Sequence, residues 1–233
     1  MSSILFARFF SGLVALRAWG ILAICAGLLG FAEVHADSAS TKVNPVVLVV
    51  GDSLSAAYGI PEKAGWVHLL RQRLAENSLP YDVINASISG DTTRGGVTRI
   101  GAALKQYQPA VVVIELGGND GLRGFPIDSA RANLETMVRT ARKANAKPLI
   151  VGVELPPNYG PVYTRRFAAM FKDVAKKYDV PVVPSLLADF GNKRELFQAD
   201  TIHPVAAAQP IMLENVWKEL QPLLQSRVLA RQQ

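Results

Sequence analysis

The chain has 233 residues and a formal net charge of +6, with 49% hydrophobic and 19% charged residues. This length suits one α/β domain with a sizeable core and is small for two. The composition excludes a disordered chain. The positive charge is mild and scattered along the sequence, so we expect no nucleic-acid partner.

The N-terminus has the pattern of an export signal. Two arginines precede an apolar stretch from Gly20 to Ala32, and Val34-His35-Ala36 fits a small-residue cleavage site. The apolar stretch is shorter than the roughly 20 residues that span a bilayer as a helix, which favours a cleaved signal over an uncleaved anchor. We therefore expect residues 1–36 to be a signal peptide, cleaved near Ala36, and the mature protein to be periplasmic or secreted.

One domain, residues 46–225, is expected between a polar lead-in at residues 37–45 and a C-terminal tail at residues 226–233. Within it, apolar strand-like runs alternate with stretches of helical periodicity. The expected strands are Val46–Val50, Tyr81–Ala86, Ala110–Leu116, Pro148–Leu155 and Val180–Pro184. The expected helices are Lys63–Asn77, Arg94–Gln106, Asp128–Asn145, Val162–Tyr178 and a last helix from about Pro204 or Val205 to Gln225. This alternation predicts right-handed βαβ units, with helices on both faces of one parallel sheet.

A serine hydroxyl follows the first expected strand, in the run Gly51-Asp52-Ser53-Leu54. Functional groups gather at the carboxyl ends of strands in open α/β sheets. A serine needs a neighbouring base to become a nucleophile at neutral pH, and only His68 and His203 remain after signal removal. His68 falls toward the polar side of its expected helix, so we interpret it as a surface or boundary histidine.

His203 stands before a proline at an expected junction of loop and helix, with Asp200 three residues upstream. This carboxylate is close enough in sequence to orient the imidazole, although an aspartate here could also cap a helix. Combined with the strand that runs into Gly-Asp-Ser, the pattern predicts a nucleophilic hydrolase. Its catalytic residues would be Ser53, Asp200 and His203.

Acyl transfer also needs hydrogen-bond donors for the oxyanion of the tetrahedral intermediate. The backbone N–H groups of Ser53 and Gly90 and the side-chain amide of Asn119 are candidates. Ordinary turn chemistry would equally explain the glycines at these positions. Two further aspartates are rivals for the acid role, but we expect Asp52 to hold the turn and Asp120 to support its own loop.

Four blocks carry a resemblance to a known family. In the order Gly51-Asp52-Ser53-Leu54, Gly90-Asp91, Gly118-Asn119-Asp120 and Asp200-Thr201-Ile202-His203, they resemble the successive motifs of the SGNH (GDSL-type) hydrolases. The resemblance covers about residues 46–224. The longer runs around the first and third blocks are similar to exported bacterial multifunctional esterases of this family, which act as thioesterases, lysophospholipases and arylesterases.

The resemblance implies a flavodoxin-like three-layer α/β/α fold with a five-stranded parallel sheet. It implies that Ser53 is the nucleophile, that His203 is the general base and then acid, and that Asp200 orients His203. It also implies an oxyanion hole formed by Ser53, Gly90 and Asn119. The absence of a Gly-x-Ser-x-Gly run around Ser53 argues against the nucleophile elbow of the α/β-hydrolases.

The expected substrate is a small-molecule acyl ester or thioester with a lipid-like or aromatic part. Residues 155–163 form a loop rich in proline and tyrosine; in the resembling family this region helps to cover an acyl chain, although a stiff surface loop would read the same. The residues that we expect to bind substrate are Tyr58, Ile60, Leu122, Pro157 and Tyr159.

Metal and cofactor sites have no support in the sequence. After signal removal only two histidines remain, far apart in sequence, and the single cysteine lies inside the signal segment, so a zinc site lacks its usual set of ligands. No nucleotide-binding glycine motif is present. We expect no metal, no cofactor, and a monomer without an obligate protein partner. Two alternatives stay open: a carbohydrate acetyl esterase of the same fold, and a non-catalytic exported binding protein.

Overall fold

Five parallel strands form the centre of the protein in the computed structural model, which describes residues 44–230 and the side chains up to residue 225. The predicted signal peptide, residues 1–36, and almost all of the predicted lead-in lie outside the described residues. Among the residues that are described, no helix combines the length and the apolar character that crossing a membrane requires.

The strands follow the order β2-β1-β3-β4-β5, and every neighbouring pair is parallel. This is the flavodoxin-like order, so the predicted fold class is confirmed. The strands are β1 (Val46–Gly51), β2 (Asp82–Asn85), β3 (Val111–Glu115), β4 (Lys147–Val151) and β5 (Val182–Val183).

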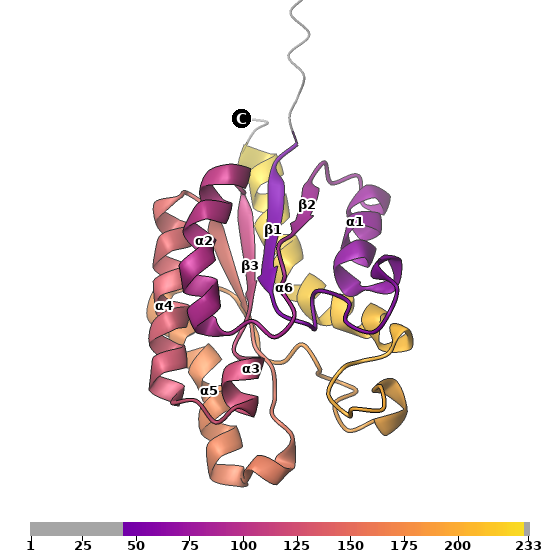
Figure 1. Cartoon of the computed structure of the whole chain (residues 1–233). Coiled ribbons are helices and arrows are strands. Elements are labelled where there is room, and N and C mark those ends of the chain that lie inside the picture. The colour runs from indigo at the N-terminus through magenta and orange to yellow at the C-terminus, as the bar shows by residue number, and fades with distance from the viewer. Residues whose placement is uncertain (1–43, 231–233) are drawn as a thin grey trace, which may run out of the picture. The chain divides into compact units, whose positions relative to one another are not determined.

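Helices cover both faces of the sheet (Figure 1). On one face α2 packs against α4 and α4 against α5, and on the other α1 packs against α6. The short α3 precedes α4 at the carboxyl ends of the strands. The helices are α1 (Trp66–Glu76), α2 (Thr93–Tyr107), α3 (Gly118–Leu122), α4 (Ile127–Lys143), α5 (Pro161–Tyr178) and α6 (Gln209–Ala230).

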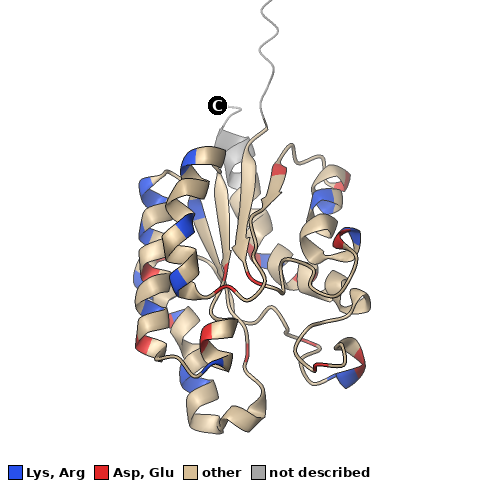
Figure 2. Cartoon of the chain, viewed as in Figure 1, with Lys and Arg blue, Asp and Glu red and all other residues tan. Residues whose placement is uncertain are grey.

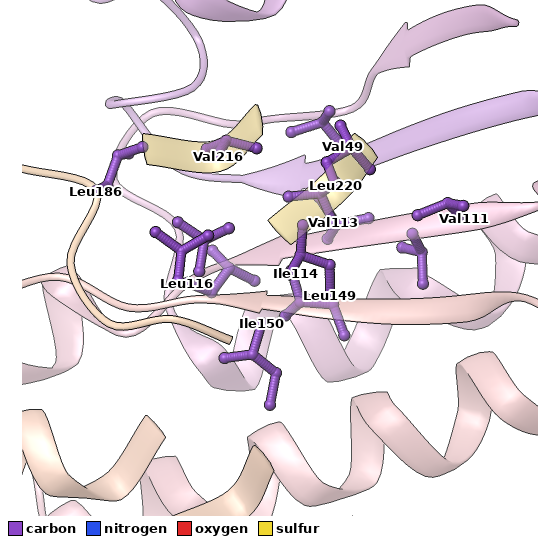
Figure 3. Packing of buried hydrophobic residues seen from close by; sticks show 14 of the residues in the cluster. Val49, Val111, Val113, Ile114, Leu116, Leu149, Ile150, Leu186, Val216 and Leu220 are labelled. Atoms are coloured by element: carbon purple, nitrogen blue, oxygen red, sulfur yellow. The ribbon is translucent and has the colours of Figure 1, made fainter. Parts of the chain in front are cut away.

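The core lies between the sheet and these helices. All five residues of β3 are buried, as expected for a central parallel strand that is covered on both faces. Figure 3 shows Val216 and Leu220 of α6 lying over strand residues such as Val49 and Val113. Each such side chain, when fully buried, contributes about 1.5–3 kcal/mol. This packing fixes the sheet, and therefore the loops at its carboxyl edge.

Charged side chains lie mainly on the outer helices. Figure 2 shows Lys and Arg spread over α2, α4 and α5, with acidic residues between them. Several form ion pairs between helices, such as Arg131 with Asp173 at 2.9 Å and Lys177 with Glu135 at 2.7 Å. The basic residues therefore form solvated helix faces, as the scattered pattern indicated.

β4 and β5 differ most from the predicted ranges, whereas the other three strands end within one residue of prediction. β4 stops at Val151, although apolar residues continue to Leu155. A Cβ atom at Gly152 would lie 2.6 Å from the carbonyl oxygen of Pro184, so the two backbone segments pass very close to each other here. The buried Val153 and Leu155 then belong to a loop, and their apolar character reflects burial, not strand pairing. β5 keeps only two residues of the predicted Val180–Pro184.

Three helices show larger differences from prediction. α1 begins at Trp66, three residues after the predicted start at Lys63, and follows a 3-10 turn at Glu62–Ala64. The last helix begins at Gln209, after a 3-10 turn at Ala206–Ala208, and continues past the predicted end at Gln225 to Ala230. The short α3 was not predicted, because its sequence Gly-Asn-Asp-Gly-Leu is poor in helix-forming residues. Its helical turn depends on tertiary contacts, and it carries Asn119.

Candidate active site

Ser53 lies in a tight turn directly after β1. The carboxylate of Asp52 accepts a hydrogen bond from the backbone N–H of Leu54 at 3.0 Å, and the carbonyl of Asp52 accepts one from Ala56 at 3.0 Å. Asp52 therefore holds the turn, the place that the sequence suggested for it. Asp52 is buried whereas Ser53 is half-buried, so the hydroxyl stands at the surface of a rigid turn.

The structure brings Ser53, His203 and Asp200 into one hydrogen-bonded line. Nε2 of His203 lies 2.9 Å from Oγ of Ser53, although the two residues are 150 positions apart in the sequence. Nδ1 of His203 lies 2.7 Å from Oδ2 of Asp200. These distances lie within the range of a nucleophile, a base and a group that orients the base.

The loop that carries Asp200 and His203 is braced by its own hydrogen bonds. Oδ1 of Asp200 accepts from the backbone N–H groups of Ile202 and His203, both at 3.0 Å. The N–H of Gln198 donates to the carbonyl of His203 at 2.8 Å, which closes the loop at its base. Thr201 adopts a positive φ of 64°, which lets the chain turn between acid and base.

The pKa of Asp200 lies at about 2, below its usual 3.8. Partial burial alone would raise it, but hydrogen bonds from the backbone and side chain of His203 and from the N–H of Ile202 outweigh that effect. The carboxylate therefore stays ionised at every pH at which the protein is expected to work. A fixed anion beside Nδ1 is what holds an imidazole in the tautomer that can accept a proton at Nε2.

Gly90 lies in the loop between β2 and α2, and Asn119 lies on α3. Asn119 lines the cavity beside Ser53, whereas Gly90 is not among the lining residues. Gly90 has a φ of +80°, which a residue with a side chain adopts only under strain, so glycine is required by the turn. Nδ2 of Asn119 donates to Oδ2 of Asp52 at 3.1 Å and to the carbonyl of Asp91 at 2.9 Å. Both amide hydrogens of Asn119 are thus engaged, and the longer bond is the one to Asp52.

Two buried carboxyl groups lie behind the Ser53 turn. Glu115, the last residue of β3, accepts from the hydroxyl of Ser55 at 2.7 Å and from the N–H of Asp52 at 3.3 Å. Burial, followed by the charge of Asp52, raises the pKa of Glu115 well above its usual value. The sequence analysis missed Glu115; the one available signal was a lone acid at the end of a continuously apolar strand.

The other titratable residues singled out in the sequence have separate places. Asp120 is buried and accepts from the N–H and the hydroxyl of Thr93, at 2.8 and 2.6 Å, so it ties α3 to the start of α2. His68 is half-buried on α1, as predicted for a boundary histidine. No group of three or more metal-ligating side chains occurs in residues 44–225.

A cavity of about 1180 Å³ opens beside the serine. Ser53, Asn119 and His203 lie on its wall, together with Leu122 and Pro157 from the predicted substrate-binding set. The rest of its wall is mixed: Leu54, Val153, Leu155, Pro156, Leu187, Ala188, Phe190, Phe197 and Ile202 are apolar, whereas Asp52, Glu154, Asp189, Asn192, Lys193, Arg194 and Thr201 are polar or charged.

The other three residues predicted to bind substrate are not among those that line the cavity. The ring centroid of Tyr58 lies 4.4 Å from that of His203, so this side chain packs on the imidazole instead. The hydroxyl of Tyr159 donates to the carbonyl of Leu122 at 2.9 Å, which places it behind the wall. Ile60 follows the Ser53 turn and is half-buried.

One whole side of the cavity was missed by the sequence analysis. It is formed by residues 187–194 together with Phe197, a segment that follows β5 and contains little regular structure. The available signal was a set of apolar residues in an otherwise polar stretch. Periodicity could not identify it, because these residues belong to a loop and not to a helix or strand.

Comparison with known proteins gives a consistent result. The GDSL-like Lipase/Acylhydrolase family matches residues 49–210. "Esterase TesA" of Pseudomonas aeruginosa is 51% identical over 178 residues, which cover 76% of this chain and 89% of that protein. "Thioesterase 1/protease 1/lysophospholipase L1" of Escherichia coli is 42% identical over 178 residues, 76% of this chain and 84% of that protein.

A solved structure agrees with these matches. The crystal structure of TesA superposes with a TM-score of 0.75 and 50% sequence identity, over 76% of this chain and 99% of that one. The resemblance that the four sequence blocks indicated is therefore confirmed: the chain belongs to the GDSL-like lipase/acylhydrolase family and is a hydrolase.

Proposed function

We propose that this protein is an exported serine esterase that hydrolyses acyl esters and thioesters through an acyl-enzyme on Ser53. The observation that carries the proposal is the line from Asp200 through His203 to Ser53, with distances of 2.7 and 2.9 Å. Ser53 and His203 lie on the wall of a cavity that also holds a group of apolar side chains. No other described serine is hydrogen-bonded to a histidine.

In the first half of the reaction, Oγ of Ser53 attacks the acyl carbonyl carbon while Nε2 of His203 takes the hydroxyl proton. Asp200 stabilises the imidazolium that forms. His203 then gives the proton to the leaving alcohol or thiol. In the second half, water attacks the acyl-enzyme, His203 takes its proton, and the proton returns to Oγ of Ser53 as the acid leaves.

The developing oxyanion would be held by the N–H groups of Ser53 and Gly90 and by Nδ2 of Asn119. Because both hydrogens of that amide are engaged in the free protein, the oxyanion must compete for one of them. The hydrogen bond from Asn119 to Asp52, at 3.1 Å, is longer than the one to the carbonyl of Asp91, at 2.9 Å. We therefore propose that the oxyanion replaces Asp52 as an acceptor of the Asn119 amide.

The apolar side chains on the cavity wall favour an acyl chain or an aromatic group as the part of the substrate that fills the cavity. Leu122 and Pro157 would contact it directly. Tyr58 would contact the substrate beside the imidazole, and Tyr159 would act by supporting Leu122. The names of the relatives, an esterase and a thioesterase/lysophospholipase, support esters and thioesters alike. The proposed working form is a periplasmic or secreted monomer.

A panel of substrates tests this function. Purified protein is assayed with aryl esters and acyl thioesters of graded acyl length, and with an acetylated sugar. We expect turnover of the esters and thioesters, and its loss in Ser53→Ala. Turnover of the acetylated sugar alone would favour the carbohydrate esterase, and no turnover of any substrate would favour the binding protein.

A further inference from the structure

One guanidinium group holds three chain segments together beside the site. Arg99, on α2, donates from Nε to Oδ2 of Asp91 at 2.7 Å and from one terminal nitrogen to the carbonyl of Gly51 at 3.1 Å. Its other terminal nitrogen donates to the carbonyl of Ala86. The three acceptors belong to the last residue of β1 (Gly51), the residue after β2 (Ala86), and the residue two positions before α2 (Asp91).

Two of these acceptors, Gly51 and Asp91, lie within two residues of a proposed oxyanion donor. Gly51 is two residues before Ser53. Asp91 directly follows Gly90, and its carbonyl accepts the hydrogen bond from Asn119 at 2.9 Å. The loop that contains Gly90 is thus held at both ends, since Ala86 precedes it and Asp91 closes it.

From this arrangement we infer that Arg99 is a positioning residue, which fixes the three oxyanion donors relative to one another; the inference rests on the proposed function. Arg99 lies outside the cavity wall, so it acts through Gly51, Ala86 and Asp91 and does not touch substrate. Its planar fork of donors suits this task, because a lysine ammonium cannot present the same fixed geometry.

The surroundings of Arg99 make the clamp strong. Its side chain is 21% exposed and that of Asp91 12% exposed, so their charged hydrogen bond is largely shielded from water. Asp91 is further held because Oδ1 accepts the N–H of Thr92 at 2.8 Å. The carbonyl of Gly51 also accepts the N–H of Ile88 at 3.0 Å, which joins β1 to the Gly90 loop a second time. Loss of Arg99 would leave these loops attached but free to shift.

A shift of the donors should change the chemical step more than substrate binding. Misplacement of about 1 Å can cost about 10²-fold in rate, even when the altered residue is remote from the reacting atoms. We therefore expect Arg99→Ala to lower kcat by about 10- to 100-fold with KM close to the wild-type value.

The matched control is Arg71 on α1. Like Arg99 it binds a backbone carbonyl, that of Val83 at 3.2 Å, and pairs with a carboxylate, that of Glu62 at 3.9 Å. It is not among the residues that line the cavity. Arg71→Ala should keep kcat close to the wild-type value. The control thus distinguishes a specific effect of Arg99 from the general effect of removing an arginine that binds a carbonyl and a carboxylate.

The experiment measures kcat and KM for wild type, Arg99→Ala and Arg71→Ala, with millimolar guanidinium chloride or with sodium chloride at the same concentration. We expect guanidinium, but not sodium, to restore part of kcat in Arg99→Ala only. A merely destabilised protein would instead be weakened by guanidinium. An Arg99→Ala protein with wild-type kcat, or a loss that guanidinium does not reverse, would overturn the inference.

Arg99→Lys decides the matter if Arg99→Ala does not fold. It keeps the positive charge beside Asp91 but loses the fork, so we expect a folded protein with kcat lowered by about tenfold or more. Wild-type kcat in Arg99→Lys would contradict the inference. Failure of the proposed function is a separate result, because it would appear as an inactive wild type.

Discussion

The carboxyl groups of Asp52 and Glu115 lie in one buried region behind the Ser53 turn, where the backbone N–H of Asp52 donates to Oε2 of Glu115 at 3.3 Å. Both side chains are almost fully buried. Two carboxylates cannot both ionise easily in such a place, so the pair titrates as a unit. The Ser53 turn is therefore built on a buried acid pair whose charge changes with pH.

This pair predicts that Asp52→Asn stabilises the protein relative to wild type as pH rises. Burial raises the pKa of Asp52 from 3.8 to about 6, so the folded state binds the proton more tightly than the unfolded chain. The contribution of protonated Asp52 to the free energy of unfolding is fully present below about pH 4. It is lost as pH rises to about 6, which lowers that free energy by about 3 kcal/mol. Removing the charge on Asp52 also eases ionisation of Glu115, which acts in the same direction.

Urea unfolding of both proteins at a series of pH values from 4 to 8 measures this difference. Asparagine at position 52 cannot accept both hydrogen bonds that the Asp52 carboxylate accepts, from Leu54 and Asn119. That loss shifts the free energy of unfolding by about the same amount at every pH. The test is therefore the change of the difference between the two proteins with pH. Parallel curves for wild type and Asp52→Asn would show that the carboxyl is ionised normally in the folded state.

Asn119→Ala should lower kcat by about 10²–10³ with little effect on KM, the effect of losing one oxyanion donor. The reason is that Nδ2 of Asn119 lies on the cavity wall with Ser53 and would bind the oxyanion only as charge develops. Steady-state kinetics on one aryl ester test it. An effect confined to KM would make Asn119 a substrate-binding residue instead.

Asp200→Asn should keep the fold and lower kcat by about 10³–10⁴, because an amide permits the wrong tautomer of His203. The pKa of Asp200 lies at about 2, so its titration leaves no limb in the working pH range. The base that accepts the Ser53 proton should be His203, so His203→Ala should lose kcat whereas His68→Ala should keep it. Loss of kcat in His68→Ala but not in His203→Ala would show that the base is His68.

The mature protein should begin at Asp37, after cleavage of residues 1–36. Export is expected because two arginines precede the apolar stretch and a small-residue site follows it. N-terminal sequencing of protein from the periplasm and medium measures the start. Intact chain in the membrane fraction would mean that the apolar stretch is an anchor.

Local patterns were enough to predict the five strands, every helix except α3, and the meeting of Ser53, Asp200 and His203 at the edge of the sheet. Ser53 and His203 are far apart in sequence, but each belongs to a recognisable motif. Ser53 is part of a Gly-Asp-Ser run that follows a strand, and His203 is part of an Asp-x-x-His run. Glu115 and Arg99 could not be identified in this way. Glu115 reads as the end of an apolar strand and Arg99 as one of many helix-surface arginines, because their partners are set by tertiary contacts alone.

The cavity wall shows the same limit. Leu122 was found because it lies near the Gly118-Asn119-Asp120 block, which follows β3. Pro157 was found because it belongs to the proline-rich loop of residues 155–163, which follows β4. Residues 187–194 were missed because loop conformation, unlike helical or strand periodicity, leaves no regular pattern in the sequence. Tyr58 and Tyr159 were predicted to line the cavity, but their rings pack on His203 and behind Leu122 instead.

The central claim is that Ser53, activated by His203, forms the covalent acyl-enzyme. The most direct measurement is mass spectrometry of the intact protein, followed by peptide mapping, after reaction with a fluorophosphonate. We predict one adduct per chain on Ser53, none in Ser53→Ala, and much slower labelling in His203→Ala. Stoichiometric labelling of a different residue, or no labelling of a protein that hydrolyses esters, would contradict the account.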